Sequence, residues 1–88
     1  MLLFFGGIQL QAQDLLVRRP AISPDGQTIA FGYQGDIFTV SSNGGEAKRL
    51  TLHESYEGMP TWSADGQRIL FMTYRNGSPD IYSITKHG

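Results

Sequence analysis

Two segments of the chain have closely similar sequences. Residues 20–31 are Pro20-Ala-Ile-Ser-Pro-Asp-Gly-Gln-Thr-Ile-Ala-Phe31, and residues 60–71 are Pro60-Thr-Trp-Ser-Ala-Asp-Gly-Gln-Arg-Ile-Leu-Phe71. Seven of the twelve positions are identical at an offset of 40, where average composition gives roughly one identity by chance. The copies continue as Asp36-Ile-Phe-Thr-Val40 and Asp80-Ile-Tyr-Ser-Ile84, at an offset of 44. A period of about 40 residues with several strands per copy is typical of a β-propeller blade.

Each copy is predicted to form an up-and-down antiparallel sheet. The expected strands are residues 20–23, 28–33, 36–41 and 47–51 in the first copy, and 59–63, 68–74 and 80–85 in the second. Between the first two strands of each copy, Asp hydrogen-bonds local amides and Gly accepts positive φ; these structural turn residues are Asp25, Gly26, Asp65 and Gly66. We therefore expect an all-β chain with two consecutive four-stranded antiparallel β-propeller blades, residues 20–51 and 59–88, joined by a loop at 52–58. The second blade is expected to lack its fourth strand.

Apolar residues occupy both faces of these strands. In the second strand, Ile29 and Phe31 point to one face and Ala30 to the other. A sheet that is apolar on both faces needs cover on both sides, which neighbouring blades provide. Two blades bury one shared interface and leave two outer faces bare, so we expect a fragment of a larger propeller or a chain that needs partner copies to fold.

The first residues differ from the rest. Residues 1–10 are rich in Leu, Phe and Ile, and Leu10-Gln-Ala12 approximates a secretory cleavage site. We interpret residues 1–12 as a signal peptide without its usual basic n-region, and residues 13–19 as a lead-in to the first blade. A disordered or strand-forming terminus is the alternative. The apolar run is far below the ~20 residues of a membrane span, so no span is expected after cleavage and the protein is expected to be periplasmic or secreted.

The composition argues against several functional classes. Eight acidic and seven basic residues give a net charge of -1 and form no basic stripe, so nucleic acid is not an expected partner. Cysteine is absent, which removes disulfide scaffolds, thiolate metal sites and cysteine nucleophiles.

The quoted segments resemble the TolB-type (WD-like) propeller repeat, whose pattern is roughly P-x-W-S-P-D-G-x-x-I-A-F followed by D-I-Y or D-I-W. The first copy departs from it at Ile22 and the second at Ala64, and the resemblance extends over residues 18–85. Most similar are the N-terminal propellers of secreted tricorn-type serine proteases, in which the propeller guides peptides and the catalytic groups lie in later domains. The resemblance thus implies a non-catalytic segment for substrate access or docking, with further blades or domains of a parent peptidase. The alternatives are a TolB-like periplasmic protein-binding module and a truncated reading frame without independent function.

No catalytic, cofactor-binding or metal-binding residue is expected in the chain. Ser23 and Ser63 lack a positioned base and a nucleophile-elbow pattern. Asp36 and Asp80 each open a strand, which favours a turn or cap role. The segment 53–57 superficially matches a zinc motif, but its second histidine is replaced by Glu57 and the helix that the motif requires is excluded by nearby Gly and Pro.

Loops offer the better functional signal. In an up-and-down sheet, alternate connections emerge at opposite edges, so the connections at 34–35, 52–58 and 75–78 share one face of the propeller. Binding residues concentrate on loops held by rigid scaffolds. We therefore expect this face to contact a peptide substrate or a protein partner, with a merely solvated loop as the alternative; the candidate residues are His53, Glu54, Tyr56, Glu57, Arg75 and Asn76.

Overall fold

The computed structural model describes the backbone of residues 2–5, 8–11 and 19–88, and the side chains of residues 19–88. All regular elements within these ranges are β-strands, as expected for an all-β fold. The predicted lead-in at 13–19, except for residue 19, and the predicted cleavage site lie outside the described residues. The part of the chain that the structure describes contains no helix that is long and apolar enough to cross a membrane.

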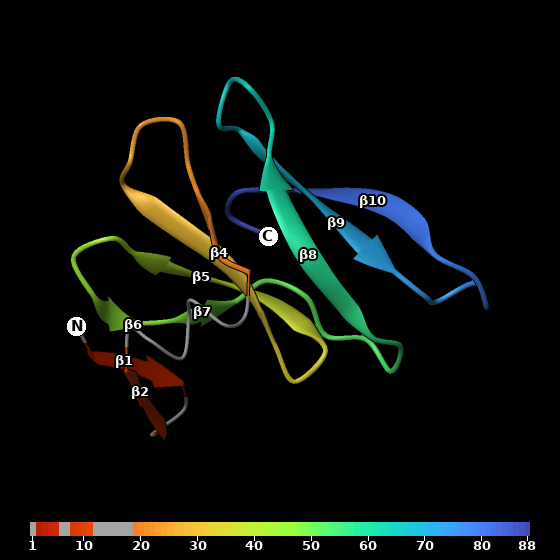
Figure 1. The fold of residues 1–88 in the computed structure, drawn as a ribbon, viewed down its shortest axis with the longest axis horizontal. Helices are drawn as coiled ribbons and strands as arrows, with labels where there is room; N and C mark the ends of the chain where they lie inside the picture. Colours follow the sequence, from red (N-terminus) through yellow and green to blue (C-terminus); the bar gives the residue numbers. More distant parts are fainter. Residues whose placement is uncertain (1, 6–7, 12–18) are drawn as a thin grey trace.

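The two sequence copies form two separate sheets that lie beside each other (Figure 1). Blade 1 has the strand order β3-β4-β5-β7, and its strands are β3 (Ala21–Ile22), β4 (Thr28–Tyr33), β5 (Asp36–Ser41) and β7 (Lys48–Arg49). Blade 2 has the order β10-β9-β8, with β8 (Glu57–Trp62), β9 (Arg68–Thr73) and β10 (Asp80–Thr85). All neighbours within a blade are antiparallel.

A third, small sheet contains the start of the chain. Strand β1 (Leu2–Phe5) pairs antiparallel with β2 (Ile8–Gln11) and parallel with β6 (Gly45–Glu46). The hairpin therefore attaches at the outer edge of blade 1, near β7 (Figure 1). Strands β1 and β2 lie within residues 1–12, the segment that the sequence suggests as a signal peptide or, alternatively, a strand-forming terminus.

Strands β4, β5 and β10 have the expected bounds, whereas the other expected strands differ by one or two residues at one or both ends. Strand β8 begins at Glu57, two residues earlier than the predicted start at 59. The extension is possible because the ladder with β9 shifts register between Gly58 and Thr61 and Met59 adopts a φ of 52°, as in a β-bulge. As a result, the connection between the blades runs over residues 50–56 instead of the predicted 52–58, and Glu57 belongs to a strand.

The shared interface between the blades is apolar. One face of blade 1 meets one face of blade 2 in a buried cluster, supported by half-buried residues around it; its buried members are Ala30, Ile37, Ile69 and Phe71. Strands β4 and β8 approach each other closely at Gly32, where a Cβ atom would lie 3.5 Å from the Cα of Gly58. Trp62 closes the interface, since its Nε1–H donates a 2.8 Å hydrogen bond to the carbonyl of Ala21.

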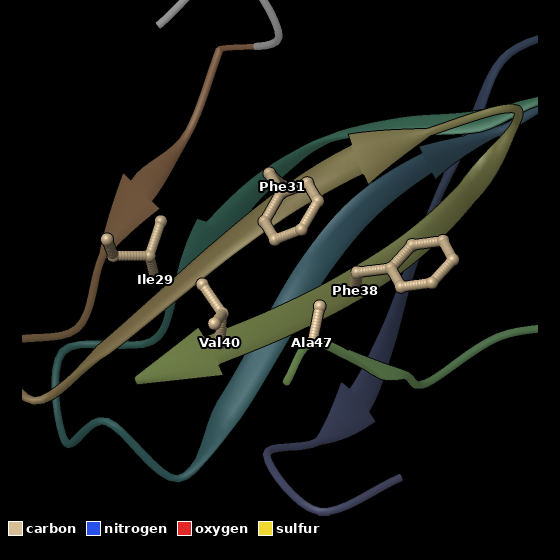
Figure 2. Packing of buried hydrophobic residues seen from close by; sticks show 5 residues of the cluster. All are labelled: Ile29, Phe31, Phe38, Val40 and Ala47. Carbon is tan, nitrogen blue, oxygen red and sulfur yellow. The ribbon is translucent and has the colours of Figure 1, made fainter. Parts of the chain in front are cut away.

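The opposite face of blade 1 is also buried, which corrects the expectation of two bare outer faces. Its side chains project to the side of β4 and β5 away from blade 2 (Figure 2); the cluster consists of Ile29, Phe31, Phe38, Val40 and Ala47. Ala47 joins it because the chain between β6 and β7 folds onto this face. The outer face of blade 2, in contrast, is open, with Ile81 63% exposed.

Candidate functional site

The later part of the connection between the blades, residues 52–56, folds over the end of the β4–β5 hairpin. The backbone N–H of His53 donates to Oδ1 of the buried Asp36 at 3.3 Å. The N–H of Glu57 donates to the carbonyl of Gly35 at 2.8 Å. Both ends of the loop are thus fixed to one hairpin, which gives a rigid mounting for the side chains between them.

The hairpin itself is a two-residue turn. Tyr33 pairs with Asp36, so only Gln34 and Gly35 lie between the strands. Both have positive φ, 50° and 83°, which is the conformation of the type I′ turns that favour twisted antiparallel strands. The turn therefore brings Tyr33 and Gln34 beside the loop between the blades.

An open pocket of about 560 Å³ lies between the hairpin and the loop. The residues that line it are Gly32, Tyr33, Gln34, Gly35, His53, Glu54, Ser55, Tyr56 and Glu57. None of these is Lys or Arg, whereas two carry carboxylates and two carry tyrosine rings. The lining therefore has a negative charge with aromatic surface beside it.

Glycines determine where the Tyr56 ring lies. A Cβ atom at Gly58 would stand 2.8 Å from the Tyr56 hydroxyl, and one at Gly35 would stand 3.9 Å from its Cδ2. The ring thus packs over backbone that has no side chain, and its centroid lies 6.3 Å from that of Tyr74. Tyr56 nevertheless stays 59% exposed, so it is held in place and remains accessible.

Glu57 forms the buried floor of this region. Its side chain is 0% exposed, and Oε2 accepts a hydrogen bond in an ion pair with Arg75 Nη2. Arg75 also donates from Nε to Thr73 Oγ1 at 3.2 Å and lies 4.6 Å above the ring of Tyr82. Burial alone would raise the pKa of Glu57, but the bond and charge of Arg75 and the hydroxyls of Thr51 and Thr73 lower that pKa below its ordinary value.

The structure unites most of the expected site residues. His53, Glu54, Tyr56 and Glu57 all line the pocket. Glu57 differs from the expectation of an exposed contact residue, because its carboxylate is buried and occupied by Arg75. Their contact with a peptide or partner stays a prediction.

The two remaining candidates, Arg75 and Asn76, are not part of the pocket lining. Arg75 stands behind Glu57 and is not part of the lining. Asn76 occupies the turn between β9 and β10, where its Nδ2 donates to Asp80 Oδ2 and the Tyr82 hydroxyl, each at 3.1 Å. Sequence reasoning missed Tyr33, although its position directly before a two-residue turn could have indicated it.

The two Ser-x-Asp-Gly turns have the same hydrogen bonds. Ser23 Oγ donates to Asp25 Oδ1 at 2.6 Å, and Ser63 Oγ donates to Asp65 Oδ1 at 2.7 Å. Each aspartate also accepts a backbone N–H two residues on, at 3.0 Å. The serine hydroxyl and this N–H lower the pKa of Asp25, and the N–H and the Ser63 hydroxyl lower that of Asp65.

In residues 19–88, no group of three or more His, Cys, Asp and Glu side chains could hold a metal ion. Each turn aspartate is engaged by its own turn, and residues 53–57 run from a loop into β8.

No protein-family model matches the chain. It is 36% identical over 75 residues to dipeptidyl-peptidase 5 of Porphyromonas gingivalis, covering 74% of this chain and 11% of that protein. It is 38% identical over 58 residues to the Tol-Pal system protein TolB of Desulfosudis oleivorans, covering 61% of this chain and 13% of that protein. It is 41% identical over 56 residues to the uncharacterized peptidase YuxL of Bacillus subtilis, covering 58% of this chain and 8% of that protein.

A solved structure shows the same arrangement. TolB from Acinetobacter baumannii superposes with a TM-score of 0.62 and 27% identity, over 77% of this chain and 18% of that chain. The chain spans roughly a tenth of the length of the curated relatives that it matches. These similarities confirm the resemblance expected from the sequence: the two copies are blades of a TolB-type propeller related to the propellers of peptidases.

Proposed function

We propose that these TolB-type blades are the non-catalytic propeller segment of a secreted peptidase, where they serve substrate access or docking. The observation that carries the proposal is the similarity to a dipeptidyl-peptidase over 75 residues, 74% of this chain. A second peptidase, YuxL, supports it over 56 residues. The repeat resembles the tricorn type of secreted protease, and in this proposal the hydrolytic groups reside in another domain of the parent.

The pocket beside the inter-blade loop is the place at which we expect peptide to be guided. Loops mounted on a rigid scaffold are the usual carriers of binding function, and this loop is tied to the β4–β5 hairpin at both ends. Its exposed side chains, including Glu54 and Tyr56, are free to meet a passing chain.

The first test is the coding sequence on both sides of these residues. We expect further propeller repeats and a peptidase domain in the same reading frame. Repeats that end in a stop codon without a peptidase domain would contradict the proposal.

The second test is kinetic and uses the full-length parent. Replacing Glu54 and Tyr56 by Ala should raise KM for a long peptide about tenfold, the equivalent of 1.4 kcal/mol of lost binding, while kcat for a short chromogenic substrate stays unchanged. Glu46→Gln, in β6 and outside the pocket lining, is the control. Unchanged kinetics for both substrates would refute a role in guiding peptides.

A second candidate function is a TolB-like periplasmic protein-binding module. The TolB superposition, with a TM-score of 0.62 over 77% of this chain, favours it. Propeller repeats that end in a stop codon would support this candidate, whereas a frame confined to these 88 residues would leave only a truncated product.

We also propose that the protein is exported and that residues 1–12 are removed. Cleavage would delete β1 and β2 together and leave β6 without its parallel neighbour. N-terminal sequencing of the exported protein should give a mature start near Gln13. A start at Met1 would show that the hairpin is kept.

A further inference from the structure

The pocket between the β4–β5 hairpin and the inter-blade loop has an uncompensated negative charge. Glu54 is exposed on its rim and forms no ion pair with any residue in the range 19–88. The nearby guanidinium groups are engaged elsewhere, Arg75 with Glu57 and Arg49 with Asp36 at 3.5 Å. Because Glu57 is neutralised by Arg75, the free charge of the lining resides on Glu54.

The same pocket is also lined by an aromatic surface. Tyr56 is fixed over Gly58 and Gly35, yet more than half of its side chain is accessible. The faces of tyrosine rings attract cations that lie within about 6 Å of the ring centroid. A carboxylate next to such a ring is a combination that recognises an ammonium or guanidinium group.

The loop also offers a hydrogen-bond donor, His53. Ser55 N–H donates to His53 Nδ1 at 3.1 Å, so the neutral imidazole carries its proton on Nε2. That N–H can donate to a carbonyl oxygen. The pocket thus combines a carboxylate that can pair with a positive charge and an N–H group that can donate a hydrogen bond to a peptide carbonyl.

We propose that this pocket is a subsite for the positively charged group of a peptide, with Glu54 as counter-charge and the Tyr56 ring as the packing surface. The inference rests on the proposed peptide-guiding function and adds the chemical class that the pocket accepts. The charged group is either the N-terminal ammonium of a peptide or a basic side chain.

The test is an NMR titration of the ¹⁵N-labelled 88-residue chain, in which binding is monitored through the chemical shifts of the backbone amides. Three probes separate the sources: Ala-Ala amide with a free N-terminus, N-acetyl-lysine amide, and the neutral N-acetyl-Ala-Ala amide. We expect shifts at residues 34–35 and 53–56 with at least one cationic probe, at Kd values on the order of 1 mM, and none with the neutral probe. Binding of Ala-Ala amide alone identifies the peptide N-terminus, and binding of the lysine probe identifies basic side chains. Equal shifts with the neutral probe, or none with any probe, would overturn the proposal.

Matched variants locate the site. Glu54→Gln should weaken the cationic probe about fivefold, as expected for one exposed charge pair. Glu46→Gln removes the same charge from an exposed position outside the pocket and should leave Kd unchanged. Gly58→Ala leaves all charges in place but displaces the Tyr56 ring, and it should also weaken binding. Equal effects of Glu54→Gln and Glu46→Gln would reduce the interaction to general electrostatics and refute the subsite.

The two proposals fail separately. If no cationic probe binds the chain but the Glu54 and Tyr56 variant of the parent loses long-peptide turnover, the guiding function stands and the charge-specific subsite is wrong. If the cationic probe binds but the parent's peptide turnover is indifferent to the same variant, the subsite stands and the guiding function is wrong.

Discussion

At the scale of single residues, Asp25 and Asp65 should make the fold sensitive to acid. Hydrogen bonds lower the pKa of both carboxyls in the folded chain, so the unfolded state binds more protons as pH falls. Their contribution is therefore complete above the unfolded value of about 4 and is lost as pH decreases through the folded values. The urea concentration at the unfolding midpoint should decrease as the pH is lowered from 5 to 2. The decrease should be smaller in the double variant Asp25→Asn/Asp65→Asn.

Glu46→Gln is the control for this pH dependence, because it removes one exposed carboxyl outside both turns. It should leave the slope of the acid limb close to that of the unmodified chain. An acid limb that is identical in the double variant and the unmodified chain would mean that the turn hydrogen bonds do not contribute.

Arg75 should be important for stability at the same scale. Arg75→Leu leaves the fully buried Glu57 carboxylate without its counter-charge. Removing one partner of a buried pair costs about 3–5 kcal/mol, and we expect about 3 because Arg75 itself is 25% exposed. Urea denaturation at pH 7 measures this loss.

Two further measurements separate charge from packing. Without Arg75, burial raises the pKa of Glu57, so protonation favours the folded variant, and Arg75→Leu should be less destabilising at pH 4 than at pH 7. Glu57→Gln/Arg75→Leu should recover part of the lost stability at pH 7, since no buried charge remains. A double variant that is less stable than Arg75→Leu at pH 7 would contradict a charge effect.

At the scale of elements, Trp62 joins β8 to β3 of the other blade. Trp62→Phe keeps an aromatic ring at the interface but removes the 2.8 Å bond to the Ala21 carbonyl. A lost hydrogen bond of this kind costs about 0.5–1.5 kcal/mol, which thermal or urea unfolding followed by circular dichroism can resolve.

Ile22 provides a matched control for Trp62. It occupies the equivalent repeat position at the offset of 40, yet it is 64% exposed. Ile22→Phe should therefore change stability by less than about 0.5 kcal/mol. Equal losses for the two substitutions would show that the Trp62 bond is not what holds the blades together.

The strands that the sequence predicts well are those with complete local signals. Strands β4, β5 and β10 begin and end at the expected residues, because alternating apolar residues lie between turn residues in each case. The start of β8 was misplaced because it depends on a bulge at Met59 and on bonds to the other blade. Such tertiary contacts leave no periodic pattern in the chain.

The same distinction applies to the pocket. Alternation of the connections placed the predicted loop 52–58 on the face of the β4–β5 turn, and the structure brings residues 53–57 together with that turn. Burial of Glu57 was not predictable, because its carboxylate depends on Arg75, which is 18 residues away in sequence. A charged residue in a polar loop has the same local signature whether it is exposed or paired in the interior.

At the scale of the whole molecule, the repeat presents two equivalent faces in different surroundings. Ile37 of β5 and Ile81 of β10 are related by the offset of 44 and occupy the second position of their strands. Ile37 is 0% exposed because blade 2 covers it, whereas Ile81 is 63% exposed. In a propeller, the equivalent surface of each blade meets the next blade, so the open face of blade 2 has the character of an interface.

These two isoleucines test how this face behaves in solution. Ile37→Val removes one buried methyl group and should cost about 0.5–1.5 kcal/mol, whereas Ile81→Val should cost less than about 0.5 kcal/mol in the monomeric chain. Urea unfolding at two protein concentrations provides the measurement, with analytical ultracentrifugation to establish the monomer. An equal loss at both positions, accompanied by a midpoint that rises with concentration, would mean that a second copy covers Ile81. In that case the pairing face would be the one that a neighbouring blade uses, and the monomer as seen here would be only half of the stable unit.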